Sequence, residues 1–166
     1  MPPKKIRAWV PTIAAAAAVV AVATPAVAGT GKAAPPQAAI QAQGDVVREV
    51  KTLTQSPMPA DQKQHEVTVT YLNESPVEEE VGPQIVFASP DEGPYLKPSD
   101  IKLERFTEAG GWEPVKLLSQ SGSLYTELSL AKRQLPENQT LTERFRFSVV
   151  TAGAVGTVYT QVAIFE

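Results

Sequence analysis

The stretch Leu141–Val149, LTERFRFSV, has the longest two-residue period in this chain of 166 residues. Apolar side chains alternate there with polar ones: Leu141, Phe145, Phe147 and Val149 against Thr142, Arg144, Arg146 and Ser148. Successive side chains of a β-strand point to opposite faces of its sheet. The alternation therefore predicts a strand with one face on a core and the other in solvent, and we expect it to be a central strand.

Shorter segments on both sides of this stretch show related patterns. Alternation or a short apolar run marks Val67–Tyr71, Ile85–Phe87, Ile101–Leu103, Val115–Leu117, Leu124–Leu130 and Val158–Ile164. Turns rich in Gly, Pro and Asn separate them, and no helical period is sustained. The chain is therefore predicted to be all-β, an antiparallel immunoglobulin-like β-sandwich of about seven or eight strands. A closed barrel would give the same local pattern.

Some element boundaries need tertiary contacts to settle them. Gly82-Pro83 is expected to end the short strand Ile85–Phe87 on its N-terminal side. Ile101–Ser119 is expected to be one β-hairpin, with a bulge near Glu104 and Arg105. The segment Val46–Leu53 fits either a short helix or an edge strand, and its β-branched residues favour the strand.

The N-terminus has the pattern of a secretory signal peptide. Lys4, Lys5 and Arg7 precede an Ala- and Val-rich segment, and small residues end at Ala28. We expect cleavage between Ala28 and Gly29. The apolar segment is short and contains a proline, which argues against a stable membrane span. The predicted organisation is a signal peptide at 1–28, a flexible Ala-, Pro- and Gln-rich leader at 29–44 and one domain at 45–166.

Composition excludes some classes of function. The chain has 15 basic and 18 acidic residues, and loss of residues 1–28 would remove three basic ones, leaving 12 and a net charge of about −6. Nucleic-acid binding needs clustered Lys and Arg, which this chain lacks. The absence of cysteine excludes disulfides, thiol nucleophiles and thiolate metal sites. No cofactor is expected.

Two polar features could carry chemistry. His65 is the only histidine, and without a nucleophile motif an exposed histidine at a strand end is the expected reading. The acidic segment Glu78–Glu80, with Asp91-Glu92 and Asp100, could supply oxygen ligands to calcium, although its spacing matches no calcium loop. A solvated acidic run that protects a sheet edge is the expected reading of Glu78–Glu80.

Three aromatic residues form the candidate ligand platform: Trp112, Tyr95 and Tyr125. Aromatic faces can stack on the apolar faces of sugar rings, provided that two or three rings are exposed in one plane. Trp112 follows a glycine turn, so it is instead expected to cap the end of the core.

Val67–Asn73, the turn at Gly110–Trp112 and Leu135–Thr142 also support a family resemblance. Over residues 46 to 166 the chain resembles small immunoglobulin-like domains of secreted and cell-wall proteins of actinobacteria. In those domains Gly often stands where this chain has Asn138, and wall-attached members end in a sorting motif that this sequence lacks. The resemblance implies a secreted, soluble β-sandwich without catalysis.

These observations predict a secreted, non-enzymatic module with a binding or structural role outside the cell. Its expected partner is a protein or a polysaccharide, recognised by loops or by a sheet edge. One alternative is a module that binds carbohydrate or a cell-wall polymer. The other is a small hydrolase that uses two carboxylates as acid and base, which requires two facing Asp or Glu side chains in one pocket.

Overall fold

The computed structural model describes residues 46–129 and 131–166, and it confirms an all-β fold with antiparallel sheets. The expected signal peptide, the cleavage site at Ala28 and Gly29 and the leader at 29–44 lie outside the described residues. The strands are β1 Val47–Pro57, β2 Gln64–Leu72, β3 Glu79–Ala88, β4 Ile101–Phe106, β5 Trp112–Pro114, β6 Leu117–Gln120, β7 Ser123–Thr126, β8 Arg133–Leu135, β9 Thr140–Val149 and β10 Thr157–Phe165. A 3-10 turn, η2 Pro98–Asp100, precedes β4. In this described part, no helix is long and apolar enough to cross a membrane.

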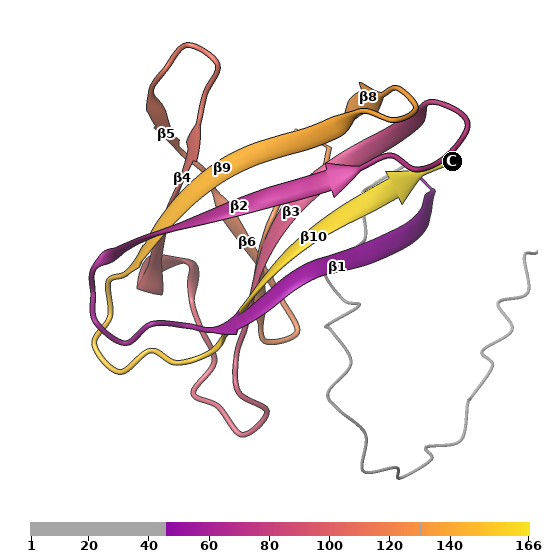
Figure 1. The fold of residues 1–166 in the computed structure, drawn as a ribbon. Helices are drawn as coiled ribbons and strands as arrows, with labels where there is room; N and C mark the ends of the chain where they lie inside the picture. The colour runs from indigo at the N-terminus through magenta and orange to yellow at the C-terminus, as the bar shows by residue number, and fades with distance from the viewer. Residues whose placement is uncertain (1–45, 130) are drawn as a thin grey trace, which may run out of the picture. The chain divides into compact units, whose positions relative to one another are not determined.

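The strands form two sheets (Figure 1). Sheet A has the order β1-β10-β3-β7-β6, with the short β8 also paired to β3. Sheet B has the order β2-β9-β4-β5. The predicted central strand, β9, indeed lies between β2 and β4.

One hydrophobic core lies between the inner faces of the two sheets. Within this core, Phe87 of sheet A packs against Phe147 of sheet B. Their rings meet edge to face, with centroids 5.2 Å apart. Val69 and Val162 are fully buried in the same cluster. Each such side chain contributes about 1.5–3 kcal/mol through removal of its apolar surface from water.

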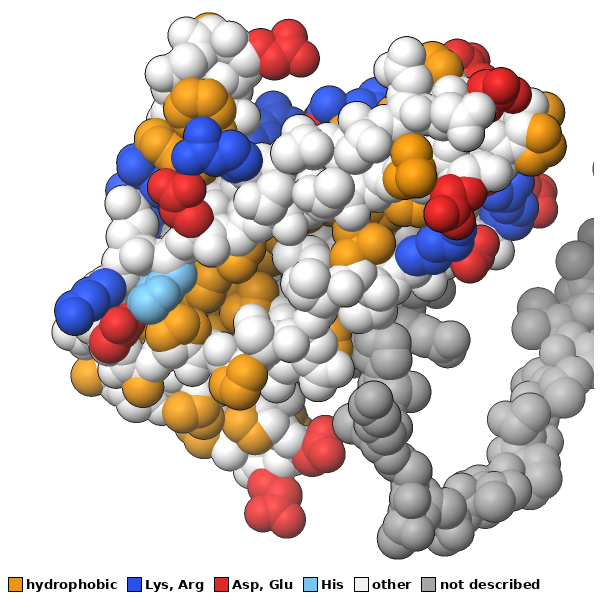
Figure 2. All heavy atoms as spheres, viewed as in Figure 1, with side chains coloured by type: hydrophobic (Ala, Val, Ile, Leu, Met, Phe, Trp, Pro, Cys, Tyr) orange, Lys and Arg blue, Asp and Glu red, His pale blue; other side chains and the backbone are white. Residues whose placement is uncertain are grey.

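The two sheets are open to each other along the side formed by β1 and β2. Figure 2 shows hydrophobic side chains in a hollow between these strands, with the pale blue histidine at one end. Leu53 of β1 and Val67 of β2 are partly buried there against the core. In the strand orders of the two described sheets, β1 and β2 each stand at one end, so both are edge strands.

Strand β3 is longer than its sequence suggests. It runs through Gly82 and Pro83, which were expected to end it. The N–H of Ile85 points toward β7 and donates to Thr126 Oγ1 over 3.1 Å, so the nitrogen of Pro83, two residues earlier, faces the same side. On that side β8 pairs with β3 only at 79–81 and β7 only at 86–88. Proline is tolerated because its missing N–H falls in the gap between them.

The predicted hairpin Ile101–Ser119 is correct only in its first half. β4 pairs with β5, and Phe106 lies opposite Trp112. After Pro114 the chain crosses to sheet A, where Leu117–Gln120 forms β6. The register between β4 and β9 runs without a shift, so the bulge expected near Glu104 and Arg105 is wrong. Phe106 is out of phase with Ile101 and Leu103 because its side chain points to the outer face of sheet B, where it meets Trp112.

Other boundaries follow from pairing partners. The ambiguous Val46–Leu53 lies mainly in strand β1, which pairs with β10 along its whole length. Leu128, expected on a strand, follows β7 in an irregular segment and packs on Ala163 and Phe165.

The strand order differs from that of an immunoglobulin constant domain. There the first two strands lie side by side in one sheet. Here β1 pairs with β10 in sheet A, whereas β2 pairs with β9 in sheet B.

Candidate functional site

A cleft of about 310 Å³ has walls from both sheets, and we call it the inner cleft. Pro83 and Thr126 of sheet A line one side, and Arg105 and Phe145 of sheet B line the other. Glu143 of β9 completes the wall. Its volume is at the lower end of the range of small-molecule sites in proteins.

Glu143 is the unusual residue of this cleft because the β9 alternation places it on the inner, apolar face. Its side chain is 7% exposed and forms an ion pair with Arg133 of β8 through Oε1. The other carboxylate oxygen, Oε2, and the Nε of Arg133 are buried without a hydrogen-bond partner. Leaving a buried polar atom unpaired costs about 1–3 kcal/mol, more when it is charged. The pair therefore retains capacity for one further donor and one further acceptor.

A second cleft, of about 580 Å³, adjoins the first at the β4–β5 hairpin, and we call it the hairpin cleft. Arg105 and Glu143 line both clefts. Burial lowers the pKa of Arg133, the nearby charge of Arg105 lowers it further, and Glu108 opposes both effects. The guanidinium of Arg133 remains protonated throughout the physiological range.

The structure places Trp112 on the outer face of sheet B, outside the core cluster that it was expected to cap. Its ring meets Phe106 edge to face at 5.1 Å. The guanidinium carbons of Arg146 and Arg144 lie 4.4 and 5.6 Å from its centroid. Cation–π contacts of this kind contribute about 0.5–2 kcal/mol each. Arginines thus cover part of the ring that the platform hypothesis would offer to a sugar.

The two tyrosines lie elsewhere. Tyr125 packs against Val86 beside Tyr159, on the face of sheet A that points away from the core. Tyr95 is 62% exposed and lines a third cleft, of about 380 Å³, that also includes Tyr159. Trp112 and Tyr125 therefore belong to different sheets, and the structure does not gather the three predicted rings around one cleft.

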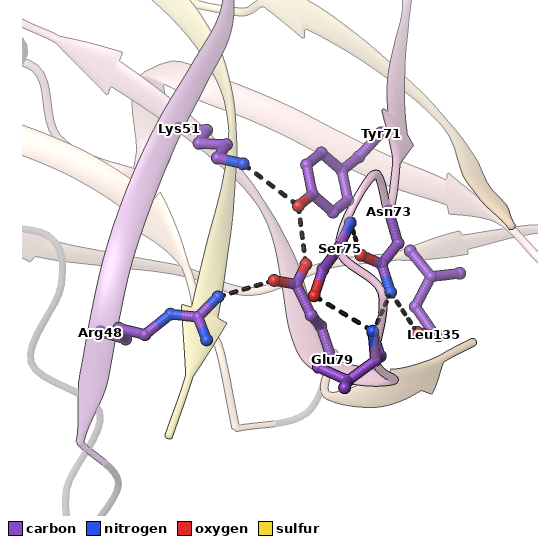
Figure 3. Close-up of polar contacts among 8 residues, drawn as sticks. Arg48, Lys51, Tyr71, Asn73, Ser75, Glu79 and Leu135 are labelled. Atoms are coloured by element: carbon purple, nitrogen blue, oxygen red, sulfur yellow. Dashed lines mark hydrogen bonds and ion pairs between the residues drawn. The ribbon is translucent and has the colours of Figure 1, made fainter. Parts of the chain in front are cut away.

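A polar network ties β1, β2 and β3 together (Figure 3). Glu79 Oε2 accepts a 2.8 Å hydrogen bond from the Tyr71 hydroxyl, and Glu79 Oε1 accepts one of 2.6 Å from Arg48. Lys51 reaches the same hydroxyl at 3.4 Å. Burial opposes ionisation of Glu79, yet the bonds from Tyr71 and Arg48 outweigh it and lower its pKa. The same burial, with the bond to Glu79, raises the pKa of Tyr71.

The expectation that Glu78–Glu80 is a solvated loop is therefore wrong for its last two residues. Glu79 is 6% exposed and starts β3, and Glu80 pairs with Lys132 at 2.8 Å. Their basic partners, Arg48 of β1 and Lys132 just before β8, hold these carboxylates against the sheet. Across residues 46–129 and 131–166, no group of three or more His, Cys, Asp or Glu side chains could hold a metal ion.

Asn73 holds the turn between β2 and β3. Its Nδ2 donates to the carbonyls of Val77 and Leu135, both at 2.9 Å, and its Oδ1 accepts from the Ser75 N–H. The side chain is fully buried. It therefore acts as a structural link between this turn and β8, as Figure 3 shows.

His65 lies near the start of β2, as predicted, but its side chain is only 30% exposed, so it is half-buried and not the exposed histidine that was expected. Its Nε2 is 2.6 Å from Asp61 Oδ1, and its ring lies 5.8 Å from that of Phe147. The bond to His65 is the main cause of the lowered pKa of Asp61. Among the described residues, no serine or threonine side chain forms a hydrogen bond with the His65 ring.

The sequence interpretation missed Glu143, Arg133 and Arg105. Glu143 did carry a signal, because it is the one charged residue in the apolar phase of Leu141–Val149. Arg133 carried none, since its strand spans only three residues and owes its position to β3.

No family model and no curated protein matches this chain. Among solved structures, the chain is similar to one described as "AvmM Catalyzes Macrocyclization in Alchivemycin A Biosynthesis", with 17% sequence identity and a TM-score of 0.45. The similarity covers 69% of this chain and 78% of that chain. At this TM-score it carries no inference about function.

Proposed function

We propose that this domain is a non-enzymatic binding module whose ligand site is the inner cleft, continued by the hairpin cleft. The observation that carries the proposal is the ion pair between buried Glu143 and Arg133, whose side chain is 38% exposed; each partner keeps one buried polar atom unpaired. Buried polar atoms are normally hydrogen-bonded, so each unpaired one calls for an explanation, and a bound ligand group is one. Glu143 lines both clefts and Arg133 lines the hairpin cleft, so the two clefts together provide the space for such a ligand.

We also propose a jelly-roll type of β-sandwich in place of the immunoglobulin-like order. Strands β1-β10-β3-β7 and β2-β9-β4-β5 alternate between the sheets as a doubly wound Greek key does, and the first and last described strands, β1 and β10, are neighbours. This winding supports the binding site because it brings β4, β5 and β9 over β3 and β7, where the inner cleft lies.

Export remains part of the proposal on the strength of residues 1–28, with Lys4, Lys5 and Arg7 before the apolar segment. N-terminal sequencing of the protein recovered from culture medium tests it. A mature terminus at Gly29 is expected. Retention of residues 1–28 in a cell-bound protein would refute export with cleavage.

Binding can be tested by NMR titration of the full chain with a library of small organic molecules. We expect shifts at Val115, Phe145 and neighbouring cleft residues for the ligands that bind. Glu143→Gln should weaken those ligands by about tenfold or more, since about 1.4 kcal/mol is lost with one charged hydrogen bond.

Asp61→Asn is the matched control for that titration. Asp61 also forms an ion pair, with His65 at 2.6 Å, but its side chain is 43% exposed, and neither residue of that pair lines either cleft. Its loss should leave affinity unchanged. Ligands that shift only residues outside the two clefts would overturn the proposed site.

The hydrolase alternative has one observation in its favour, since Glu127 and Glu143 line the same cleft. A pair of carboxylates in one cleft is the minimum for acid–base cleavage of a glycoside. Turnover of aryl glycosides by the full chain, abolished by Glu127→Gln, would establish this activity in place of simple binding. Unchanged turnover in that variant, or none in the wild type, would remove it.

A further inference from the structure

We infer that the ligand of the two clefts is a neutral, hydroxyl-rich molecule of the saccharide class. This inference rests on the proposed binding function and adds the chemistry of the ligand. Three properties of the site lead to it: the balance of its charges, the type of its unpaired atoms and the nature of its walls.

Charges in the walls are balanced. In the inner cleft, Arg105 and Lys116 stand against Glu127 and Glu143. In the hairpin cleft the three arginines and three glutamates are Arg105, Arg133, Arg144, Glu108, Glu113 and Glu143. An ionic ligand would gain attraction from one half of each set and repulsion from the other half. The walls therefore favour a ligand without net charge.

The unpaired atoms call for a group that both donates and accepts. Arg133 Nε–H is a donor, and Glu143 Oε2 is an acceptor. A hydroxyl group can accept a hydrogen bond from Arg133 Nε–H and donate one to Glu143 Oε2. A carboxylate could only accept and an ammonium could only donate, so either would leave one buried atom unsatisfied.

The remaining walls suit the carbon skeleton of a sugar. Pro114, Val115 and Phe145 give the inner cleft an apolar surface, and Phe106 does so for the hairpin cleft. Apolar and aromatic surfaces pack well against the C–H faces of sugar rings. Because both clefts meet at Arg105 and Glu143, a ligand of more than one ring could occupy the two together.

The test is calorimetric and NMR titration of the full chain with defined oligosaccharides. The neutral probes are cellotetraose, xylotetraose, maltotetraose and mannotetraose. The charged probes are trigalacturonate, which is anionic, and glucosamine trimer, which is cationic. N-acetylglycinamide tests whether a carboxamide, the other group that donates and accepts, replaces the hydroxyl.

We expect at least one neutral oligosaccharide to bind, with an affinity that changes less than twofold between 50 and 500 mM salt because no ions pair. Its protons should give nuclear Overhauser contacts to the Val115 methyls in the wild-type protein. This measurement needs no variant, so it stands even if a change at the Glu143–Arg133 pair prevents folding.

Variants then locate the polar contact. Arg133→Lys keeps the positive charge but removes Nε, and it should weaken the neutral oligosaccharide at least tenfold. Tyr95→Ala is the control, because it removes an exposed aromatic ring that lines neither the inner nor the hairpin cleft. Affinity should not change in that variant.

Three outcomes would overturn the inference: binding restricted to a charged probe, binding restricted to N-acetylglycinamide, or no binding of any neutral oligosaccharide. In each case the proposed function survives if another small molecule shifts the cleft residues. It fails separately if nothing binds there.

Discussion

Tyr71 of β2 donates its phenolic hydrogen to Glu79 of β3 over 2.8 Å, and this bond joins sheet B to sheet A. Both residues are 6% exposed. Arg48 extends the connection to β1 through the second carboxylate oxygen. A single buried carboxylate thus connects three strands from the two sheets, close to the side where the sheets are otherwise open.

Tyr71→Phe should destabilise the domain by about 1.5–3 kcal/mol, because Glu79 loses its bond to an uncharged donor while staying buried. Urea unfolding measures the free energy. In a double-mutant cycle, Tyr71→Phe and Glu79→Gln should show a coupling energy of about 0.5–3 kcal/mol. Additive effects of the two substitutions would contradict the direct bond.

Glu79 should also make the domain sensitive to acid. Its pKa is lower in the folded protein than its usual value, so the folded state binds the proton less readily than the unfolded chain. The resulting stability is complete above about pH 4.5, the region of the unfolded pKa, and is lost as the pH falls through the folded pKa. Unfolding curves from pH 7 to pH 3 should show a shallower loss for Glu79→Gln than for the wild type. Parallel curves would assign the acid sensitivity to other carboxylates, such as Asp61.

Asn73→Ala should be among the most destabilising substitutions, by about 2–4 kcal/mol, since it leaves two carbonyls and one N–H without their partner. Ser75→Ala in the same turn is the control. The Ser75 hydroxyl accepts only one exposed bond, from Val77 N–H at 3.3 Å, so its loss should cost less than about 1 kcal/mol. Equal losses in thermal unfolding would show that Asn73 does not hold β8.

Gly156→Ala should destabilise by about 1–3 kcal/mol, because a Cβ at this position would lie 2.5 Å from the Ala88 carbonyl oxygen, in fixed backbone. Gly111→Ala is the matched control: its Cβ would meet no atom within 4 Å. That change should fall within about 0.5 kcal/mol of the wild type. Denaturant midpoints of the two variants compare them directly, and a tolerant Gly156→Ala would mean that β10 can shift away from β3.

The sequence was most informative where a side-chain period was long. Leu141–Val149 predicts β9 correctly because one face of that strand contacts the core and the other contacts solvent. The sequence was least informative where the pairing of a neighbouring strand determines whether a residue can lie inside a strand. Pro83 looks like a strand end, yet it is accommodated since β8 and β7 pair with β3 on either side of it.

The sheet to which a strand belongs could not be predicted from local pattern. Val115 and Leu117 continue the alternation of β5, but the chain crosses between the sheets after Pro114. Prediction of the candidate site also required knowledge of which strands pack together. Glu143 could have been singled out from its position in β9, whereas Arg133 and Arg105 reach it only through the packing of β8 and β4.

The first strand of this domain lies against the last one: Val47 is opposite Phe165, and the N–H of Glu166 donates to the Val46 carbonyl over 3.1 Å. Figure 1 shows the start of β1 and the C-terminus at the same end. A few residues could therefore bridge residues 46 and 166 without stretching, and new termini could be opened in the exposed hairpin turn at Gly110-Gly111. The domain is thus a natural candidate for circular permutation, and for insertion as a cassette into a surface loop of another protein.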